Sequence, residues 1–200
     1  DGEAARDYSG RSVSSAGDVN GDGFDDVIIS APGTDSNGSP TGSSYVVFGK
    51  ASGFDAAMNL SGLDGSNGFR LDGGSSRSVS GARDVNGDGF DDVIIGASGA
   101  GSNGSNSGSS YVVFGRASGF DAVMNLSGLD GSNGFRLDGE AEGDFLGSSV
   151  SSAGDVNGDG FDDVIIGAPY ADRNGDYSGS SYVVLGKASG FDAVMNLSGL

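Results

Sequence analysis

The feature that most constrains this chain is an internal repeat. The segment DVNGDGFDDVII begins at Asp18, at Asp84 and at Asp155, so that successive copies start 66 and 71 residues apart. In each copy the segment GSSYVV follows 24 residues after that first aspartate. A fixed internal period is typical of repeat proteins, in which each repeat forms one supersecondary unit. The sequence therefore predicts three copies of one structural unit within a single repeat domain, 1–200.

Glycine placement excludes helices of ordinary length. The chain has 40 glycines among its 200 residues, and the longest window without one, Phe24–Pro32, has nine residues. A mean α-helix needs about 11–12 residues, and a glycine inside it costs about 1 kcal/mol. A glycine-rich composition without a period is typical of disordered segments, but these three copies stay in register. We therefore expect an all-β fold.

Each unit contains four short strand candidates, A to D, separated by clusters of turn-forming residues. In the third unit, A, B and C are expected near 148–153, 163–168 and 181–186, after a D strand at 134–138. B and C are continuous apolar runs, which indicate burial on both faces of a sheet. Four-stranded antiparallel meanders stacked face to face are the blades of a β-propeller. A parallel β-helix has much shorter rungs, and a β-sandwich would need a separate core for each unit, so a propeller is preferred.

Three blades do not close a propeller. We expect blades at approximately 1–71, 72–137 and 138–200, the last without its outer strand. Propellers close with about four to eight blades, so the chain is either a fragment of a larger propeller or a protein that self-associates. Open blade faces would expose apolar surface, and the simplest prediction is a homodimer with six blades.

The repeated loop DVNGDGFDD carries the clearest chemical signal. Calcium takes about six to eight oxygen ligands in a flexible geometry, and alternate residues of a tight loop can direct oxygens at one centre. Positions 1, 3, 5 and 9 offer side-chain oxygens, position 7 offers a backbone carbonyl, and the glycine at position 6 permits a sharp turn. The sequence predicts three calcium sites per chain. Their ligands would be Asp18, Asn20, Asp22, Phe24 and Asp26; Asp84, Asn86, Asp88, Phe90 and Asp92; and Asp155, Asn157, Asp159, Phe161 and Asp163.

Two other structures could account for this loop. An EF-hand has a glutamate at position 12 and continues as a helix, whereas position 12 here is an isoleucine within an apolar β run, so the loop is not an EF-hand. The alternative that the loops are Asp-Gly turns without metal stays open, although carboxylates held this close repel one another strongly without a cation. At position 8, Asp25, Asp91 and Asp162 are expected to point away from the metal into solvent.

The DxNxDGxxD loop, an apolar strand ending in Gly167-Ala168-Pro169 and a YVVFG strand together resemble the FG-GAP repeat, which occurs in integrin alpha-chain β-propellers and many bacterial surface proteins. The first two copies have SAP and GAS in place of GAP, and the third has Leu185 in place of the phenylalanine of YVVFG. These departures lie at strand ends and leave the ligand positions intact. The resemblance implies that the loop joins strands A and B, that its calcium is structural, and that the protein is extracellular or at the cell surface.

The two faces of the predicted propeller differ among the copies. In an antiparallel meander the A–B and C–D loops emerge on one face, and the B–C and D–A loops on the other. The calcium loops are identical, whereas the B–C loops read APGTDSNGSPTG, ASGAGSNGSNSG and APYADRNGDYSG. We therefore expect a protein or glycan ligand on the face opposite the calcium loops, with drift or a purely structural spacer as the alternatives. Because tyrosine and arginine are favoured at interfaces, the contact candidates are Tyr170, Asp172, Arg173 and Tyr177.

Composition argues against several classes of function. Lys and Arg total 10 against 28 Asp and Glu, a formal net charge of −18, which argues against nucleic-acid binding. The absence of His and Cys removes the commonest general base and all thiol chemistry, so we expect no enzyme. No apolar run reaches the roughly 18 residues of a membrane helix, so no membrane insertion is expected. If the protein is secreted, its signal lies outside this sequence.

Overall fold

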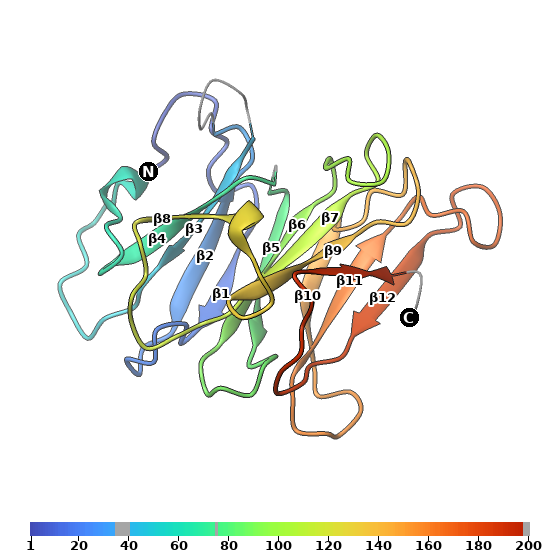
Figure 1. Ribbon diagram of the computed structural model, residues 1–200. Coiled ribbons are helices and arrows are strands. Elements are labelled where there is room, and N and C mark those ends of the chain that lie inside the picture. The colour runs from blue at the N-terminus through green and yellow to red at the C-terminus, as the bar shows by residue number, and fades with distance from the viewer. Residues whose placement is uncertain (35–40, 75, 198–200) are drawn as a thin grey trace.

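The computed structural model describes residues 1–34, 41–74 and 76–197, which form three β-sheets standing side by side (Figure 1). We call these sheets blades 1, 2 and 3, from left to right in the figure. In each blade, strands that follow one another along the chain pair in an antiparallel meander. The meander strands are β1 (Val13–Gly17), β2 (Asp26–Ala31), β3 (Ser43–Val47) and β4 (Gly68–Asp72); β5 (Ser78–Arg83), β6 (Asp92–Ala97), β7 (Ser109–Val113) and β9 (Gly134–Asp138); and β10 (Ser149–Gly154), β11 (Asp163–Ala168) and β12 (Ser180–Val184).

The all-β prediction is confirmed. In the described part of the chain, helix is limited to two single turns of 3-10 helix, η1 (Leu60–Gly62) and η2 (Leu126–Gly128). The strands expected at 134–138 and 163–168 coincide with β9 and β11, and those at 148–153 and 181–186 lie within two residues of β10 and β12. The predicted blade boundaries after residues 71 and 137 each fall one residue before the end of an outer strand. Ring closure and this division into blades stay predictions.

Blades 1 and 2 each gain a fifth strand from the blade that follows. β8 (Val123–Asn125) belongs to the connection between β7 and β9, but it pairs in parallel with β4 of blade 1. β13 (Val194–Asn196) pairs in the same way with β9 of blade 2. Figure 1 shows the connection that carries β8 crossing from blade 2 to blade 1. A segment of three residues has no recognisable strand pattern, and its partner lies in another repeat, so the sequence indicated only a loop here.

Most of the apolar core lies between the blades, and a smaller third cluster belongs to blade 1 alone. One cluster of buried side chains is shared by blades 1 and 2, and a second is shared by blades 2 and 3. Every residue of β6 is buried, which agrees with the burial on both faces that its apolar run predicted. The equivalent strands β2 and β11 contain exposed positions, because only one face of each outer blade is covered. The two larger clusters are therefore shared between neighbouring repeats.

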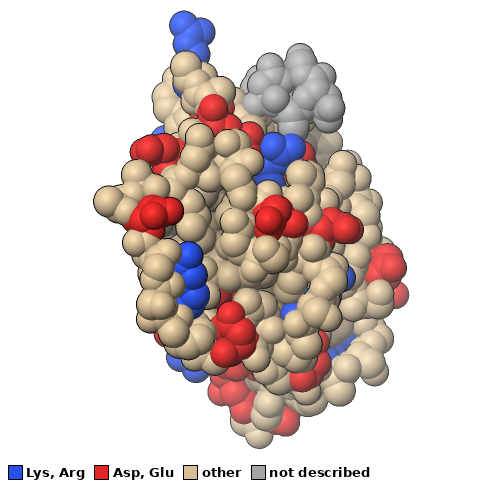
Figure 2. Space-filling model, turned by 90° about the vertical axis from the view of Figure 1, so that its left-hand side faces the viewer, with Lys and Arg blue, Asp and Glu red and all other residues tan. Residues whose placement is uncertain are grey.

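The uncovered faces of blades 1 and 3 expose apolar side chains. On blade 1, Val13 and Val27 are 64% and 45% exposed, whereas the equivalent Val79 and Val93 of blade 2 are 4% and 0% exposed. Figure 2, which views the molecule from the side of blade 1, shows a surface that is mostly uncharged between separate acidic and basic side chains. Exposed apolar side chains of blade 3 include Val156, Ile165, Val183 and Leu185.

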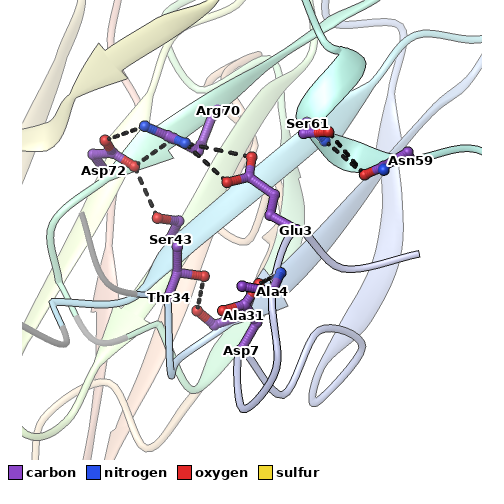
Figure 3. A network of polar contacts seen from close by, with 10 residues as sticks. All are labelled: Glu3, Ala4, Asp7, Ala31, Thr34, Ser43, Asn59, Ser61, Arg70 and Asp72. Carbon is purple, nitrogen blue, oxygen red and sulfur yellow. Dashed lines mark hydrogen bonds and ion pairs between the residues drawn. The ribbon is translucent and has the colours of Figure 1, made fainter.

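A polar network joins β3 and β4, the third and fourth strands (C and D) of blade 1 (Figure 3). The Arg70 guanidinium on β4 pairs with the carboxylates of Asp72 and Glu3, at N–O distances of 2.8 and 3.1 Å. The Ser43 hydroxyl on β3 donates a hydrogen bond to Asp72 at 2.8 Å. The Ser43–Asp72 bond links residues that face each other in the β3–β4 register and so supports that register, while Arg70 joins Asp72 to Glu3 of the N-terminal segment. Blade 2 contains the equivalent group of Arg136, Asp138 and Ser109.

Candidate metal centre

The three predicted calcium loops lie along one edge of the molecule, at the bottom of Figure 1. Each connects the first two strands of a blade, whose pairing shifts at a β-bulge just before the loop. The bulge residue has a left-handed backbone, with φ of 75° at Gly17, 60° at Arg83 and 69° at Gly154. The described B–C loops lie along the opposite edge in the same figure. The structure thus separates the two loop sets as the meander predicted.

In the first loop, hydrogen bonds from the loop backbone gather the side chains at positions 1, 3 and 5. The two Asp18 carboxylate oxygens accept from Asp22 N at 3.0 Å and from Gly23 N at 2.9 Å. Asn20 Oδ1 also accepts from Asp22 N at 2.9 Å. Asp22 Oδ1 accepts from Phe24 N at 3.0 Å. Glycines at positions 4 and 6, with φ of 71° and 89°, permit the tight turn because they have no Cβ.

The other two loops repeat this geometry. The same four hydrogen bonds recur in loops 2 and 3, with lengths of 2.9–3.1 Å. In loop 3, the Asp155 carboxylate also accepts from Gly158 N at 2.7 Å. Backbone hydrogen bonds, first of all the one from Gly160, lower the pKa of Asp155. An ionised carboxylate has more lone pairs than these bonds use, so the side chains at positions 1 and 5 keep the capacity to ligate a cation.

The aspartates at position 9 anchor the loops. Asp26 accepts from Val19 N at 2.9 Å and from Gly49 N at 2.8 Å, one bond to each carboxylate oxygen. Asp92 and Asp163 accept from the equivalent backbone groups. All three side chains are buried. Position 9 therefore ties the start of its loop to the segment after strand C, a role that the sequence did not reveal.

Burial makes two of these anchors unusually basic. The pKa of Asp26 is raised to about 6, chiefly by burial and to a smaller extent by the carboxylates of Asp22 and Asp18, while two backbone hydrogen bonds oppose the rise. The same causes raise the pKa of Asp92 to about 8. The larger shift follows from the position of blade 2, which is covered on both sides. Positions 1, 5 and 9 of these two loops therefore lie within electrostatic reach of one another.

The donor set of the loops fits a hard cation. Carboxylate, amide and carbonyl oxygens are the ligands that Ca²⁺ takes, and positions 1, 3 and 5 converge within one turn. Among the described residues, however, no group of three or more Asp, Glu, His or Cys side chains is arranged to hold a metal ion. Both oxygens of the position 9 carboxylate already accept backbone N–H groups. The prediction of fifteen calcium ligands is not tested by these contacts and stays a prediction.

The expectation of a solvated side chain at position 8 is wrong for the second loop. Asp91 Oδ2 accepts a hydrogen bond from Asp18 N, across the junction between blades 1 and 2, at 2.8 Å. Asp162 Oδ1 lies 3.8 Å from Arg83 Nη1 across the next junction. Asp25, in the first loop, is exposed as expected. The contact of Asp91 depends on a neighbouring blade, which is why a loop considered alone could not reveal it.

On the opposite edge, the four contact candidates divide into two pairs. Tyr170 and Tyr177 are exposed, with ring centroids 5.8 Å apart. Asp172 Oδ1 instead accepts from Tyr177 N at 2.6 Å. The Arg173 guanidinium forms an ion pair with Glu140. The structure thus leaves the two tyrosines exposed, engages Asp172 within its own loop, and pairs Arg173 with the segment between β9 and β10. The B–C loop of the first blade lies partly outside the described residues.

The FG-GAP repeat model matches residues 9–47, 76–113 and 146–184. Each match contains strands A, B and C of one blade together with its metal loop. The chain belongs to the FG-GAP repeat family. The resemblance drawn from the loop and its flanking strands is therefore confirmed, and the three sheets are FG-GAP propeller blades.

Integrin alpha chains are among the known proteins that are similar to this FG-GAP chain. It is 35% identical over 172 residues to integrin alpha-PS5 of Drosophila melanogaster, covering 86% of the chain and 16% of that protein. It is 31% identical over 189 residues to integrin alpha pat-2 of Caenorhabditis elegans, and the match covers 87% of the chain and 14% of that protein. It is 30% identical over 173 residues to integrin alpha-4 of Xenopus laevis, and the match covers 86% of the chain and 15% of that protein. The chain thus spans about one-sixth of the length of these relatives. In its described residues, no helix is long and apolar enough to cross a membrane.

Proposed function

We propose that this chain is part of an extracellular, adhesion-type β-propeller whose FG-GAP loops bind structural calcium. The observation that carries the proposal is the threefold repetition of one oxygen-rich loop, with the same hydrogen bonds each time, on a single edge of the molecule. The similarity to integrin alpha chains supports a role in adhesion at the cell surface. An enzymatic role has no support, since the chain has neither His nor Cys.

The calcium would be held chiefly by the side chains at positions 1, 3 and 5 and by the carbonyl at position 7. When bound, it would supply the positive charge that offsets the repulsion among the loop carboxylates. The buried aspartate at position 9 holds the loop ends in place. Since loops 1 and 2 also contact the next blade, ordering these loops would stiffen the junctions between blades. In this proposal, calcium is structural and takes no part in catalysis.

Thermal unfolding in calcium and in chelator tests the metal assignment. A ligand that binds only the folded state at 100 times its Kd stabilises it by about 2.7 kcal/mol, so three sites should raise the midpoint clearly. Asp88→Asn should reduce the shift, because position 5 of loop 2 loses a carboxylate. The control is Asp121→Asn, which removes an exposed charge outside the loops. No midpoint shift at millimolar calcium would overturn the assignment.

The partner would be a protein or glycan bound on the face opposite the metal loops. The exposed pair Tyr170 and Tyr177 supports this placement, because tyrosine provides rigid contact area in many interfaces. Screening the chain against immobilised matrix proteins and a glycan array should find a ligand, whose affinity falls in Tyr170→Ala and Tyr177→Ala at unchanged stability. Failure to bind any probe would favour the alternative, a structural spacer of a larger surface protein.

Self-association is also proposed, in the form of a homodimer with six blades. Its support is the apolar surface on the open faces of blades 1 and 3, which carry side chains that are buried at the equivalent positions of blade 2. Burying such surface is the main favourable term in protein association. Light scattering of the folded protein in calcium should give twice the mass of the 19.7 kDa chain. A stable monomer would reject this part of the proposal.

A further inference from the structure

We propose that the position 8 aspartate of one blade is a positioning residue for the cation loop of the preceding blade. The residue concerned is Asp91 of blade 2, which lies outside the predicted ligand set and acts on loop 1 through Asp18. As a consequence, loop 1 binds its cation more tightly when blade 2 is docked beside it. This inference rests on the calcium sites of the proposed function and adds coupling between neighbouring blades.

Two reciprocal hydrogen bonds connect Asp91 with Asp18, the residue at position 1 of loop 1. Asp91 Oδ2 accepts from Asp18 N at 2.8 Å, and Asp91 N donates to Asp18 O at 3.2 Å. Because both backbone polar groups of Asp18 bond to one residue of blade 2, the position of the Asp18 side chain depends on that blade. The Asp91 carboxylate also places an additional negative charge next to loop 1.

The close fit at this junction depends on a glycine just before loop 1 and on another within it. A methyl group at Gly17 would overlap the Asp91 carboxylate, and one at Gly21 would overlap the ring of Phe90. Blade 2 also donates a hydrogen bond from Arg116 N to Val19 O at 2.9 Å. Loop 1 is therefore clamped by the metal loop of blade 2 and by the segment that follows its strand C.

The junction between blades 2 and 3 provides an internal comparison. It keeps the backbone bond from Asp162 N to Asp84 O at 3.2 Å. In the described structure, however, Asp84 N donates no hydrogen bond to the Asp162 carboxylate, which instead lies 3.8 Å from Arg83. Arg83 occupies the bulge position that Gly17 holds in blade 1, and its backbone is left-handed like that of Gly17, with φ of 60°. At Gly17 an added Cβ would overlap the Asp91 carboxylate, so we infer that the Cβ of Arg83 obstructs the same place in the second junction.

Arg83 therefore accounts for the difference between the two junctions. Its side chain excludes Asp162 from the backbone of loop 2 and counters the negative charge of that carboxylate. Residues that orient metal ligands without touching the metal typically change affinity by about 10- to 100-fold when mutated. Loop 1 is held by both the side chain and the backbone of Asp91, whereas loop 2 is held only by the backbone bond from Asp162. Loop 1 should therefore bind calcium more tightly than loop 2.

Calcium titration followed by ¹⁵N NMR tests the proposal loop by loop. The position 6 amides of Gly23, Gly89 and Gly160 each donate to the position 1 carboxylate of their own loop, so their signals report occupancy separately. Asp91→Ala should weaken binding at loop 1 by about tenfold and leave loop 3 unchanged. Asp25→Ala is the matched control, because this aspartate has the same loop position but is exposed; it should change no loop.

Two further variants keep the test decisive if Asp91→Ala folds poorly. Asp91→Asn retains an acceptor oxygen without the charge and should weaken loop 1 by a smaller factor. Arg83→Gly removes the obstructing Cβ and should tighten calcium binding at loop 2. Equal loop 1 affinity in wild type and Asp91→Ala, or an equal effect of Asp25→Ala, would overturn the positioning role alone. A wild-type protein that binds no calcium would overturn the proposed function as well.

Discussion

The strand exchange between blades predicts that one substitution is costly in one repeat and harmless in another. Phe191, which precedes β13, is 7% exposed. Its ring stacks on Phe135 of β9 with centroids 4.7 Å apart and an interplanar angle of 5°, and it lies 5.3 Å from the ring of Phe114. Phe54 occupies the same position of the first repeat, but it is 58% exposed. The two residues have the same local sequence and differ in their surroundings.

The expected magnitudes follow from these surroundings. Truncating a buried phenylalanine to alanine costs about 3–5 kcal/mol, of which a stacked aromatic pair provides about 0.5–1.5 kcal/mol. We therefore expect Phe191→Ala to lower the free energy of unfolding by about 3 kcal/mol. Phe54→Ala should lower it by less than about 0.5 kcal/mol, as is usual for an exposed side chain. Since domains are stable by about 5–15 kcal/mol, the first effect is large.

Urea denaturation in saturating calcium measures both variants. The chain has no tryptophan, so far-ultraviolet circular dichroism is the suitable signal, at protein concentrations where self-association is absent. Hydrogen exchange of the β9 amides should accelerate in Phe191→Ala, because that strand loses the side chain that holds β13 against it. Equal costs for Phe54→Ala and Phe191→Ala, or a cost below about 1 kcal/mol for the latter, would refute the packing role assigned to the exchanged strand.

Two further predictions concern charge and backbone conformation. Burial raises the folded-state pKa of Asp92 to about 8 from its ordinary 3.8, so between these values the folded state binds the additional proton. Without calcium, the free energy of unfolding should therefore fall between pH 5 and 8, by up to about 1.4 kcal/mol per pH unit. Urea unfolding in chelator measures the slope, and Asp92→Asn should reduce it; an unchanged slope would contradict the assignment. Gly17→Ala should cost more than Gly154→Ala in thermal unfolding. Both residues have positive φ, which costs about 1–2 kcal/mol for alanine, but only at Gly17 does the methyl group also overlap Asp91. Equal losses would show that this contact is unimportant.

Much of the fold follows from local sequence. Each copy of DVNGDGFDD supplies glycines at the positions where the backbone is left-handed. It also supplies short polar side chains, which accept hydrogen bonds from N–H groups two to five residues further on. These contacts need no other part of the chain, and so the loops, the strands beside them and the FG-GAP family were all predictable. The convergence of positions 1, 3 and 5 belongs to the same local chemistry.

The three-dimensional neighbours decided the rest. Val19, Val85 and Val156 occupy the same position of identical loops, yet the first two are buried and the third is exposed, because no described blade covers blade 3. The parallel pairing of β8 with β4 and the contact of Asp91 with Asp18 likewise join different repeats. The sequence by itself determined the repeating unit, its turns and its oxygen-rich loops, since those depend on residues close along the chain. Tertiary structure alone decided which copy is covered and which aspartate reaches another blade, because burial and pairing depend on what lies beside a residue in space.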